Sequence, residues 1–431
     1  MASKGFNSGD VIIKHLYLSS LDGNKFIDLR EQAQDIDIYE SILSPIITGS
    51  ITIVDKVSLR ENFPIIGGKC KVKLQFTTPT EGIPTRTLEF VVSEVSNVTT
   101  DPHSAGNRYT LTLASVEILE NAKSYFRAPL IGNTIDDYVE IILKDVIKTK
   151  KNVYKEPNGT KGQQRMDVVS MKPFQAIDMM KQKAVSKVYK SNVYAFFENK
   201  LGFNFVPIEY LLSDTTKLIQ DGIFFYDSDS KTNVLNTTYR NILAYNHIVQ
   251  ESPAKIVSEG ALKNKTVQID LRTRSKQTTV YDHSKAKDEL QYSKGARPTH
   301  KAAFEQQYGE LPATTFNVIK SSVAPETYVH EKIGYAQAFI TMLTQNILRI
   351  MVWGDTYISA GYRIRVEAPK PTGLTKSGGK TAAGQKSDFT SGEFLISHLR
   401  HNLSRINTGY RHMMSMELVN VAYGRSGAYD S

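Results

Sequence analysis

The sequence carries one β-rich pattern twice, near its beginning and near its end, and this repeat restricts the fold more than any other feature. The run Glu89–Ser93 (EFVVS) returns as Glu393–Ser397 (EFLIS). In each copy a strand that follows a glycine precedes the run, at 68–74 and at 361–367, and another strand comes after it. Recurrence of such a unit indicates a duplicated architecture. We therefore expect two β units of one design, separated by a region with a different pattern.

Aromatic residues are expected at the centre of each copy. Phe90 and Phe394 occupy the same place in the two runs, and Tyr109 and Tyr410 begin the strands that follow. Because side chains alternate between the faces of a strand, matching alternation puts both phenylalanines on the same face of their strands. Opposite residues of an antiparallel pair contact each other. We predict that the two hairpins are structurally equivalent and that these four residues form the core of the repeat.

The hydrophobic period changes after about residue 125. Residues 1–125 alternate as strands do between Gly, Pro, Asn and Asp turns, which is typical of an antiparallel sheet or barrel. Residues 126–260 mix both periods: one helix is expected after Thr134, a second begins at Pro173, and a β-hairpin covers 193–206. This part is predicted to be an α+β middle domain.

The last part of the chain, 261–425, returns to β structure. We expect a long inserted loop at about 276–314, a helix at about 326–343 and a Gly/Lys/Ser-rich loop at 369–391. The predicted fold is therefore mainly β, with two similar antiparallel β-barrel domains flanking the α+β middle domain.

Composition excludes several classes of protein. With 431 residues, 40% hydrophobic and 23% charged, the chain is long enough for two or more cores and unlike a disordered protein. A single cysteine, Cys70, cannot form an intramolecular disulfide. The N-terminal segment lacks the apolar centre of a signal peptide, and the most apolar stretch, 339–353, is too short to cross a bilayer. We expect a protein made in a cytoplasm, with no membrane segment.

The net charge of +9 comes from 53 basic and 44 acidic residues, and the excess is concentrated in 261–301. One interpretation is a solvated loop with an exposed strand face. The other is a surface that contacts nucleic acid or an acidic protein, with salt-sensitive binding where phosphates are involved. The residues chosen to represent this possible contact surface are Lys263, Lys265, Arg272 and Arg274.

Three stretches partly match motifs of known chemistry. Residues 376–381 (KSGGKT) end like a phosphate-binding loop, but Leu374 stands where the first glycine is required. Residues 227–233 (DSDSKTN) begin like a calcium loop, but Lys231 replaces an oxygen ligand. The closing hairpin has a histidine cluster without a nearby cysteine or carboxylate ladder, which favours a polar hairpin face over a zinc site: His398, His401 and His412. We expect no cofactor, no metal and no catalytic residue.

Four segments together follow the pattern of a known family: Asp37–Asp55 (DIYESILSPIITGSITIVD), Phe196–Val206, Gly354–Gly361 and Ser391–Ser397. They resemble the baseplate central hub proteins of contractile-tailed bacteriophages, and the same pattern is similar to the N-terminal part of type VI secretion spike proteins. The resemblance implies a homotrimeric ring around a central channel in the tail baseplate of a virion. Its implied partners are the central spike protein, the tail tube protein, and the tape measure and baseplate wedge proteins. The family has no catalytic residues to transfer, and the loops at 276–314 and 369–391 match nothing in its pattern.

The leading hypothesis is thus a structural hub, in which two similar β domains in each of three chains form a ring with pseudo-sixfold symmetry. The alternative is a nucleic-acid-contacting channel protein that uses the basic region 261–301. A polysaccharide-active enzyme is a third class, disfavoured because no catalytic motif supports it.

Overall fold

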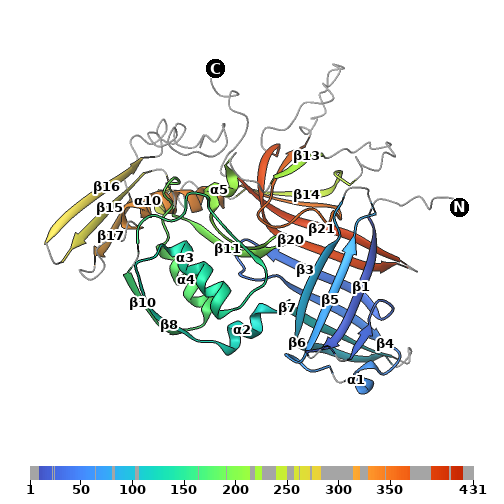
Figure 1. Cartoon of the computed structure of the whole chain (residues 1–431). Helices are drawn as coiled ribbons and strands as arrows, with labels where there is room; N and C mark the ends of the chain where they lie inside the picture. The colour runs from blue at the N-terminus through green and yellow to red at the C-terminus, as the bar shows by residue number, and fades with distance from the viewer. Residues whose placement is uncertain are drawn as a thin grey trace, which may run out of the picture.

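The computed structural model describes most of the chain from residue 9 to residue 420. The described residues are 9–21, 23, 25–63, 65–79, 83–101, 106–163, 165–190, 192–213, 219–225, 239–249, 257–261, 263–271, 274–282, 314–320, 329–344, 346–368, 390–406 and 409–420. Within them, strands predominate (Figure 1).

The first β unit follows the predicted alternation of buried and exposed residues. Its elements are β1 (Asp10–Ser20), β2 (Phe26–Asp28), β3 (Ala33–Ser41), β4 (Thr48–Asp55), α1 (Leu59–Asn62), β5 (Cys70–Thr77), β6 (Arg86–Asp101) and β7 (Gly106–Ser115). Inward-facing side chains such as Leu16, Ile51, Val72 and Phe90 form one hydrophobic core. The unit occupies the lower right of Figure 1, in blue.

The second β unit has a core of its own, which contains Ile350, Phe394 and Leu418. Its strands are β13 (Ile219–Phe225), β14 (Ile242–Val249), β18 (Asn346–Trp353), β19 (Arg363–Glu367), β20 (Gly392–Ile406) and β21 (Gly409–Asn420). We had placed the boundary of this domain at residue 261. The pairing of β13 and β14 with β19 and β18 contradicts that boundary and assigns both strands to the second unit.

The two units have the same strand order. Neighbouring strands follow the order β1-β5-β6-β7-β4-β3 in the first and β13-β19-β20-β21-β18-β14 in the second. When the strands of each unit are numbered 1 to 6 along the chain, leaving out the short β2, both orders read 1-4-5-6-3-2. One pairing differs in direction, because β1 is antiparallel to β5 whereas β13 is parallel to β19. The predicted duplication is confirmed at the level of strand order.

Two irregularities occur at equivalent places in both units. Ser93 is an extra residue in β6 against β7, and Ser397 is an extra residue in β20 against β21. Each serine hydroxyl donates to a backbone carbonyl of the neighbouring strand, at 3.0 Å and 2.9 Å. Gln34 in β3 and Leu243 in β14 are likewise extra residues against β4 and β18. Since bulges bend a strand at a defined point, matched bulges indicate that both units curve in the same way.

The units are joined through strands rather than through a linker. β3 pairs antiparallel with β20, and β1 pairs with β21. The pairings therefore form a closed circuit of β1, β5, β6, β7, β4, β3, β20 and β21 within one 13-stranded sheet. The two similar β units predicted from the sequence thus share one sheet, seen where the red and blue strands meet in Figure 1.

The middle region combines helices with short strands. It contains α2 (Glu117–Lys123), β8 (Phe126–Ile131), α3 (Ile135–Ile141), the π-helix η1 (Ile142–Val146), β9 (Asn152–Lys155), β10 (Arg165–Met171), α4 (Pro173–Lys183), β11 (Tyr194–Asn199), β12 (Gly202–Pro207) and α5 (Ile208–Leu212). As predicted, α3 begins directly after Thr134 and α4 begins at Pro173.

The hairpin of β11 and β12 connects the middle region to the second β unit. All residues of both strands are buried, so apolar side chains occur on both faces of the hairpin instead of alternating with exposed ones, and the polar Glu198, Asn199 and Asn204 are buried with them. Phe196 and Phe205 pack into the core of the helices, whereas Phe197 and Val206 pack into the core of the second unit. The hairpin therefore lies between two cores and fixes their relative position.

A small sheet with one helix packed against it lies apart from the shared sheet, at the upper left of Figure 1. It consists of β15 (Lys263–Asp270), β16 (Ser275–Asp282), β17 (Thr314–Lys320) and α10 (Val329–Leu343). The helix confirms the expectation for 326–343. The expected loop at 276–314 is wrong over 276–282, which belongs to β16, and its remainder up to residue 313 lies outside the described residues. No helix of the described chain is both long and apolar enough to cross a membrane.

Candidate functional site

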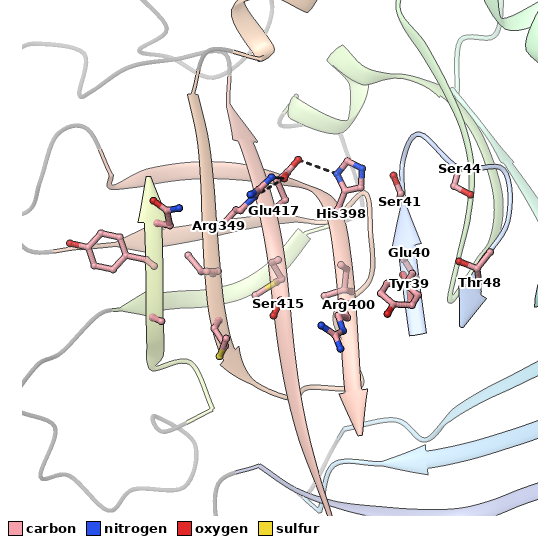
Figure 2. Close-up of a pocket in the computed structure, with 17 residues that line it drawn as sticks. Tyr39, Glu40, Ser41, Ser44, Thr48, Arg349, His398, Arg400, Ser415 and Glu417 are labelled. Atoms are coloured by element: carbon pink, nitrogen blue, oxygen red, sulfur yellow. Dashed lines mark hydrogen bonds and ion pairs between the residues drawn. The ribbon is translucent and has the colours of Figure 1, made fainter. Parts of the chain in front are cut away.

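A groove of about 480 Å3 crosses the outer face of the shared sheet where the two units meet (Figure 2). It extends from β3 across β20, β21 and β18 to β14. Pairing in register places side chains from different strands in rows across it. One row consists of Tyr39, Arg400, Ser415 and Met351. Because these are the outward positions of their strands, the groove belongs to the solvent face of the sheet.

A second row carries charges. Arg349 donates from Nε to Oε2 of Glu417 at 3.0 Å, and Nδ1 of His398 lies 3.2 Å from Oε1 of the same carboxylate. Figure 2 shows these side chains converging on Glu417 from the two neighbouring strands. Arg349 is more than half exposed, so this pair contributes at most about 1 kcal/mol. Its main effect is to fix the register of three strands.

Charges are also paired across the boundary between the units. Arg400 of β20 binds Asp37 of β3 through Nε at 2.9 Å and through its NH2 group at 3.0 Å. Asn402 donates a further hydrogen bond to Asp37 at 2.8 Å. The hydrogen bond with Asp37 raises the pKa of Arg400, and partial burial, together with the Asp37 charge, raises the pKa of Tyr39. The charged groups of these two rows are thus paired with one another across neighbouring strands.

Beneath the groove, inward-facing residues of β3, β20 and β21 form a buried polar network with Arg86 of β6, between the two units. Arg86 of β6 donates to Glu40 of β3, to the backbone carbonyl of Ile358 at 3.1 Å, and to Nε2 of His401 at 2.9 Å. The second oxygen of Glu40 accepts from the Ser359 hydroxyl and from the backbone N–H of Ala360. The Arg86 and Glu40 side chains are at most 2% exposed. A buried charge pair of this kind is costly to break.

The protonation of the two histidines in this network follows from their donors. Arginine can only donate, so Nε2 of His401 accepts and its Nδ1–H donates to Nε2 of His412 at 2.9 Å. Burial, with the Arg86 charge as a further cause, lowers the pKa of His401 well below its usual value. Burial, with His401 and Arg86 as further causes, lowers the pKa of His412 in the same way. Both imidazoles are therefore neutral, and Phe76 packs edge-on against both rings. Burial also lowers the pKa of Arg86 to about 10, which leaves it charged at neutral pH.

The predicted histidine cluster is divided between the two faces of the sheet. His401 and His412 are buried and adjacent, whereas His398 lies on the opposite face of β20 and points into the groove. Among the described residues, no group of three His, Cys, Asp or Glu side chains is arranged to hold a metal ion. The pattern expected for this hairpin was one polar face; the structure has a polar outer face and a buried polar pair instead.

The predicted repeat residues are brought together only in part. Phe90 and Phe394 are both buried and both pair with the strand that precedes them, β5 and β19. The tyrosines are not equivalent: the registers of β6–β7 and β20–β21 align Tyr109 with Met414 instead of Tyr410. Tyr410 packs against the core of the first unit, and burial raises its pKa to about 12. The differing loop lengths concealed this shift in the sequence.

The possible contact surface lies on the small sheet. Lys263 and Lys265 occupy alternate positions of β15, so they share the face opposite the one buried against α10. Arg274 is exposed at the turn between β15 and β16, and Arg272 lies outside the described residues. So do the two loop motifs considered from the sequence, at 227–233 and 376–381.

The buried network was missed in the sequence analysis, although a signal for it exists. In β3, Ile36, Ile38 and Glu40 occupy the inward positions, so a charged residue stands where the alternation requires an apolar one. His401 interrupts the inward run of β20 in the same way. The groove had no such signal, because its rows depend on strands that are far apart in the sequence.

No family model matches the sequence, and no curated protein matches it either. The fold, however, matches solved structures over almost the whole chain. A tail protein from Neisseria meningitidis MC58 has 12% identity and a TM-score of 0.57, covering 94% of this chain and 96% of that protein. The 43 kDa tail protein of prophage MuSo2 from Shewanella oneidensis has 12% identity and a TM-score of 0.53, covering 95% and 99%. The fold is that of phage tail proteins. This agrees with the resemblance found in the sequence.

Proposed function

We propose that the protein is the structural hub of a contractile phage tail baseplate, a homotrimer in which six similar β units surround a central channel. One observation carries the proposal: two units of identical strand order lie side by side in one sheet, within a fold that phage tail proteins share over at least 94% of the chain. A tail joins parts of threefold and sixfold symmetry. A ring of three chains with two similar units each has three equivalent chains for a threefold partner and six similar units for a sixfold partner.

The partners proposed for this hub are the tail tube protein on one side of the ring and the central spike protein on the other, with the tape measure and baseplate wedge proteins as further contacts. The proposed location is the virion tail. The polar outer face of the shared sheet, with its paired charges, would then line the channel. The basic face of β15 and β16 is proposed as a contact for an acidic partner protein, where charge mainly affects the association rate and the choice of partner.

The mass of the purified full chain tests the proposal directly. Native mass spectrometry should give a species of about 145 kDa for three 48.3 kDa chains, and a larger complex when the spike protein is coexpressed. A protein that stays monomeric at high concentration, with and without the spike protein, would overturn it. Obligate interfaces of this kind bury more than about 2,000 Å2, so the trimer should persist on dilution to micromolar concentration.

A further inference from the structure

We propose that chains of this protein join through two specific strand edges: β14 of one copy adds, antiparallel, to the second half of β6 in the next copy. The proposal rests on the hub function and identifies the interface that would close the ring. It comes from a contact that the chain already makes with itself. Within one chain, β3 of the first unit pairs with the second half of β20, over 398–404.

The duplication assigns a counterpart to each strand of that contact. The matched bulges align β3 with β14, so that Ala33 corresponds to Ile242 and Asp35 to Ala244. They also align β20 with β6 through Ser397 and Ser93. The counterpart of the β3–β20 contact is therefore a contact between β14 and β6.

This counterpart is not made within one chain. In the described part of the chain, β14 is the last strand of the sheet and pairs only with β18. β6 pairs with β5 over 86–91, and its remaining residues up to Asp101 pair only with β7. The same half of β20 pairs on both sides, with β21 and with β3. Among the described strands, none pairs with the second side of β14 or with the second side of this half of β6.

Both edges largely lack the residues that protect an edge strand from pairing with another strand. β14 (ILAYNHIV) contains no Lys, Arg, Asp, Glu or Pro, the residues that usually protect an edge, and Leu243 and Tyr245 are more than a third exposed. In β6, Val98 is half exposed, and acidic residues occur only at the two ends of the open half, at Glu94 and Asp101. An exposed edge of this kind favours addition of a strand.

The internal contact also predicts the register. Tyr39 lies opposite Arg400 and Asp37 lies opposite Asn402. The corresponding residues place Ile248 of one copy opposite Ser96 of the next, and Asn246 opposite Thr99, with the bulge at Asn97 taken into account. Neither predicted pair brings like charges together, which would be unfavourable. Because the edges differ, the contact is heterologous, and three repeats of it close a ring when each contact turns the next copy by a third of a full rotation.

Disulfide crosslinking tests this register in the full chain. Opposite residues of an antiparallel pair have Cα atoms about 4.5–5.5 Å apart, which a disulfide can span. The variant I248C/S96C should form reducible dimers and trimers on a non-reducing gel, with the two cysteines in one linked peptide. The internal counterpart Y39C/R400C should crosslink within one chain and keep the monomer mobility. The natural Cys70 is buried and should not take part.

The control is I248C/V95C, in which the shift by one residue turns the second thiol to the other face of β6. It should form about tenfold less crosslinked product, because the thiol at position 95 faces away from the partner thiol. One outcome would overturn the edge assignment and leave the hub function intact: the wild-type protein is a trimer and Y39C/R400C links internally, but I248C/S96C stays uncrosslinked. Equal crosslinking of both intermolecular variants would overturn the register. A wild-type monomer at all concentrations would overturn the edge contact together with the hub.

Discussion

Replacing Arg86 with methionine should weaken the junction between the two β units more than any single change in the groove above it. The substitution keeps much of the side-chain length but removes the charge beside Glu40. The carboxylate retains two donors, the Ser359 hydroxyl and the Ala360 N–H, while the carbonyl of Ile358 and the ring of His401 each lose one. The result is a buried carboxylate without its cation.

The expected cost follows from burial. Removing one member of a buried ion pair typically costs about 3–5 kcal/mol, because the remaining charge is desolvated without compensation. Since Glu40 keeps two hydrogen-bond donors, we expect the lower end, about 3 kcal/mol. The variant R400M is the matched control. It removes a guanidinium that also joins β20 to β3, but this one is about half exposed, so its loss should cost about 0–1 kcal/mol.

Urea unfolding followed by the fluorescence of Trp353, the only tryptophan, measures both variants. With a slope of about 3 kcal/mol per M, the R86M midpoint should fall by about 1 M and the R400M midpoint by less than about 0.3 M. The double variant E40Q/R86M should recover more than half of the loss, since a neutral replacement of both partners is often tolerated. Equal midpoints for R86M and R400M would refute the reasoning.

Three further predictions concern pH, the core and the basic face. Burial lowers the folded-state pKa of His401 and His412, so as the pH falls these histidines bind protons in the unfolded chain before they do so in the folded one. Below about pH 6.5 the free energy of unfolding should therefore fall by up to about 1.4 kcal/mol per pH unit for each histidine. Urea unfolding of H401L/H412F should lack this part of the slope, and an unchanged slope would contradict the assignment. Phe394→Asp should unfold the second unit at 25 °C, as seen by circular dichroism, because an unpaired carboxylate in the core costs several kcal/mol; a soluble variant with the wild-type melting temperature would disprove this. A variant in which four basic residues are changed to glutamine should keep the fold, but its binding to tube or spike protein, measured by light scattering, should depend less on salt. Loss of duplex DNA binding alone would favour the nucleic-acid alternative. The four residues are Lys263, Lys265, Arg272 and Arg274.

Local sequence patterns were sufficient to predict the elements of this fold and its duplication. Period-two alternation in the first unit, the proline at the start of α4 and the apolar hairpin of β11 and β12 each depend on neighbouring residues. The repeat could be predicted because Phe90 and Phe394 stand in runs of equal length. These features are specified by residues a few positions apart, which a single sequence displays directly.

Long-range pairing could not be predicted in the same way. Tyr109 and Tyr410 were aligned by residue type, whereas the ladders, counted from the matched bulges at Ser93 and Ser397, align Tyr109 with Met414. The assignment of β13 and β14 to the second unit likewise depends on pairing with strands about 100 to 140 residues further on, and alternation alone carries no such information. The groove arises from this pairing and so was also missed.

The buried network gives a physical reason why two similar contacts in one molecule do not exchange. If β14 of another copy took the place of β3 against β20, the aligned bulges would put Val249 where Glu40 stands, and Arg86 would lose its partner. That exchange would cost about 3–5 kcal/mol. An ion pair contributes little net stability compared with apolar packing, but it distinguishes β3 from β14 at the one strand that both could join. The internal contact is thereby restricted to its own chain, and β14 is left available for the edge of β6 in the next copy.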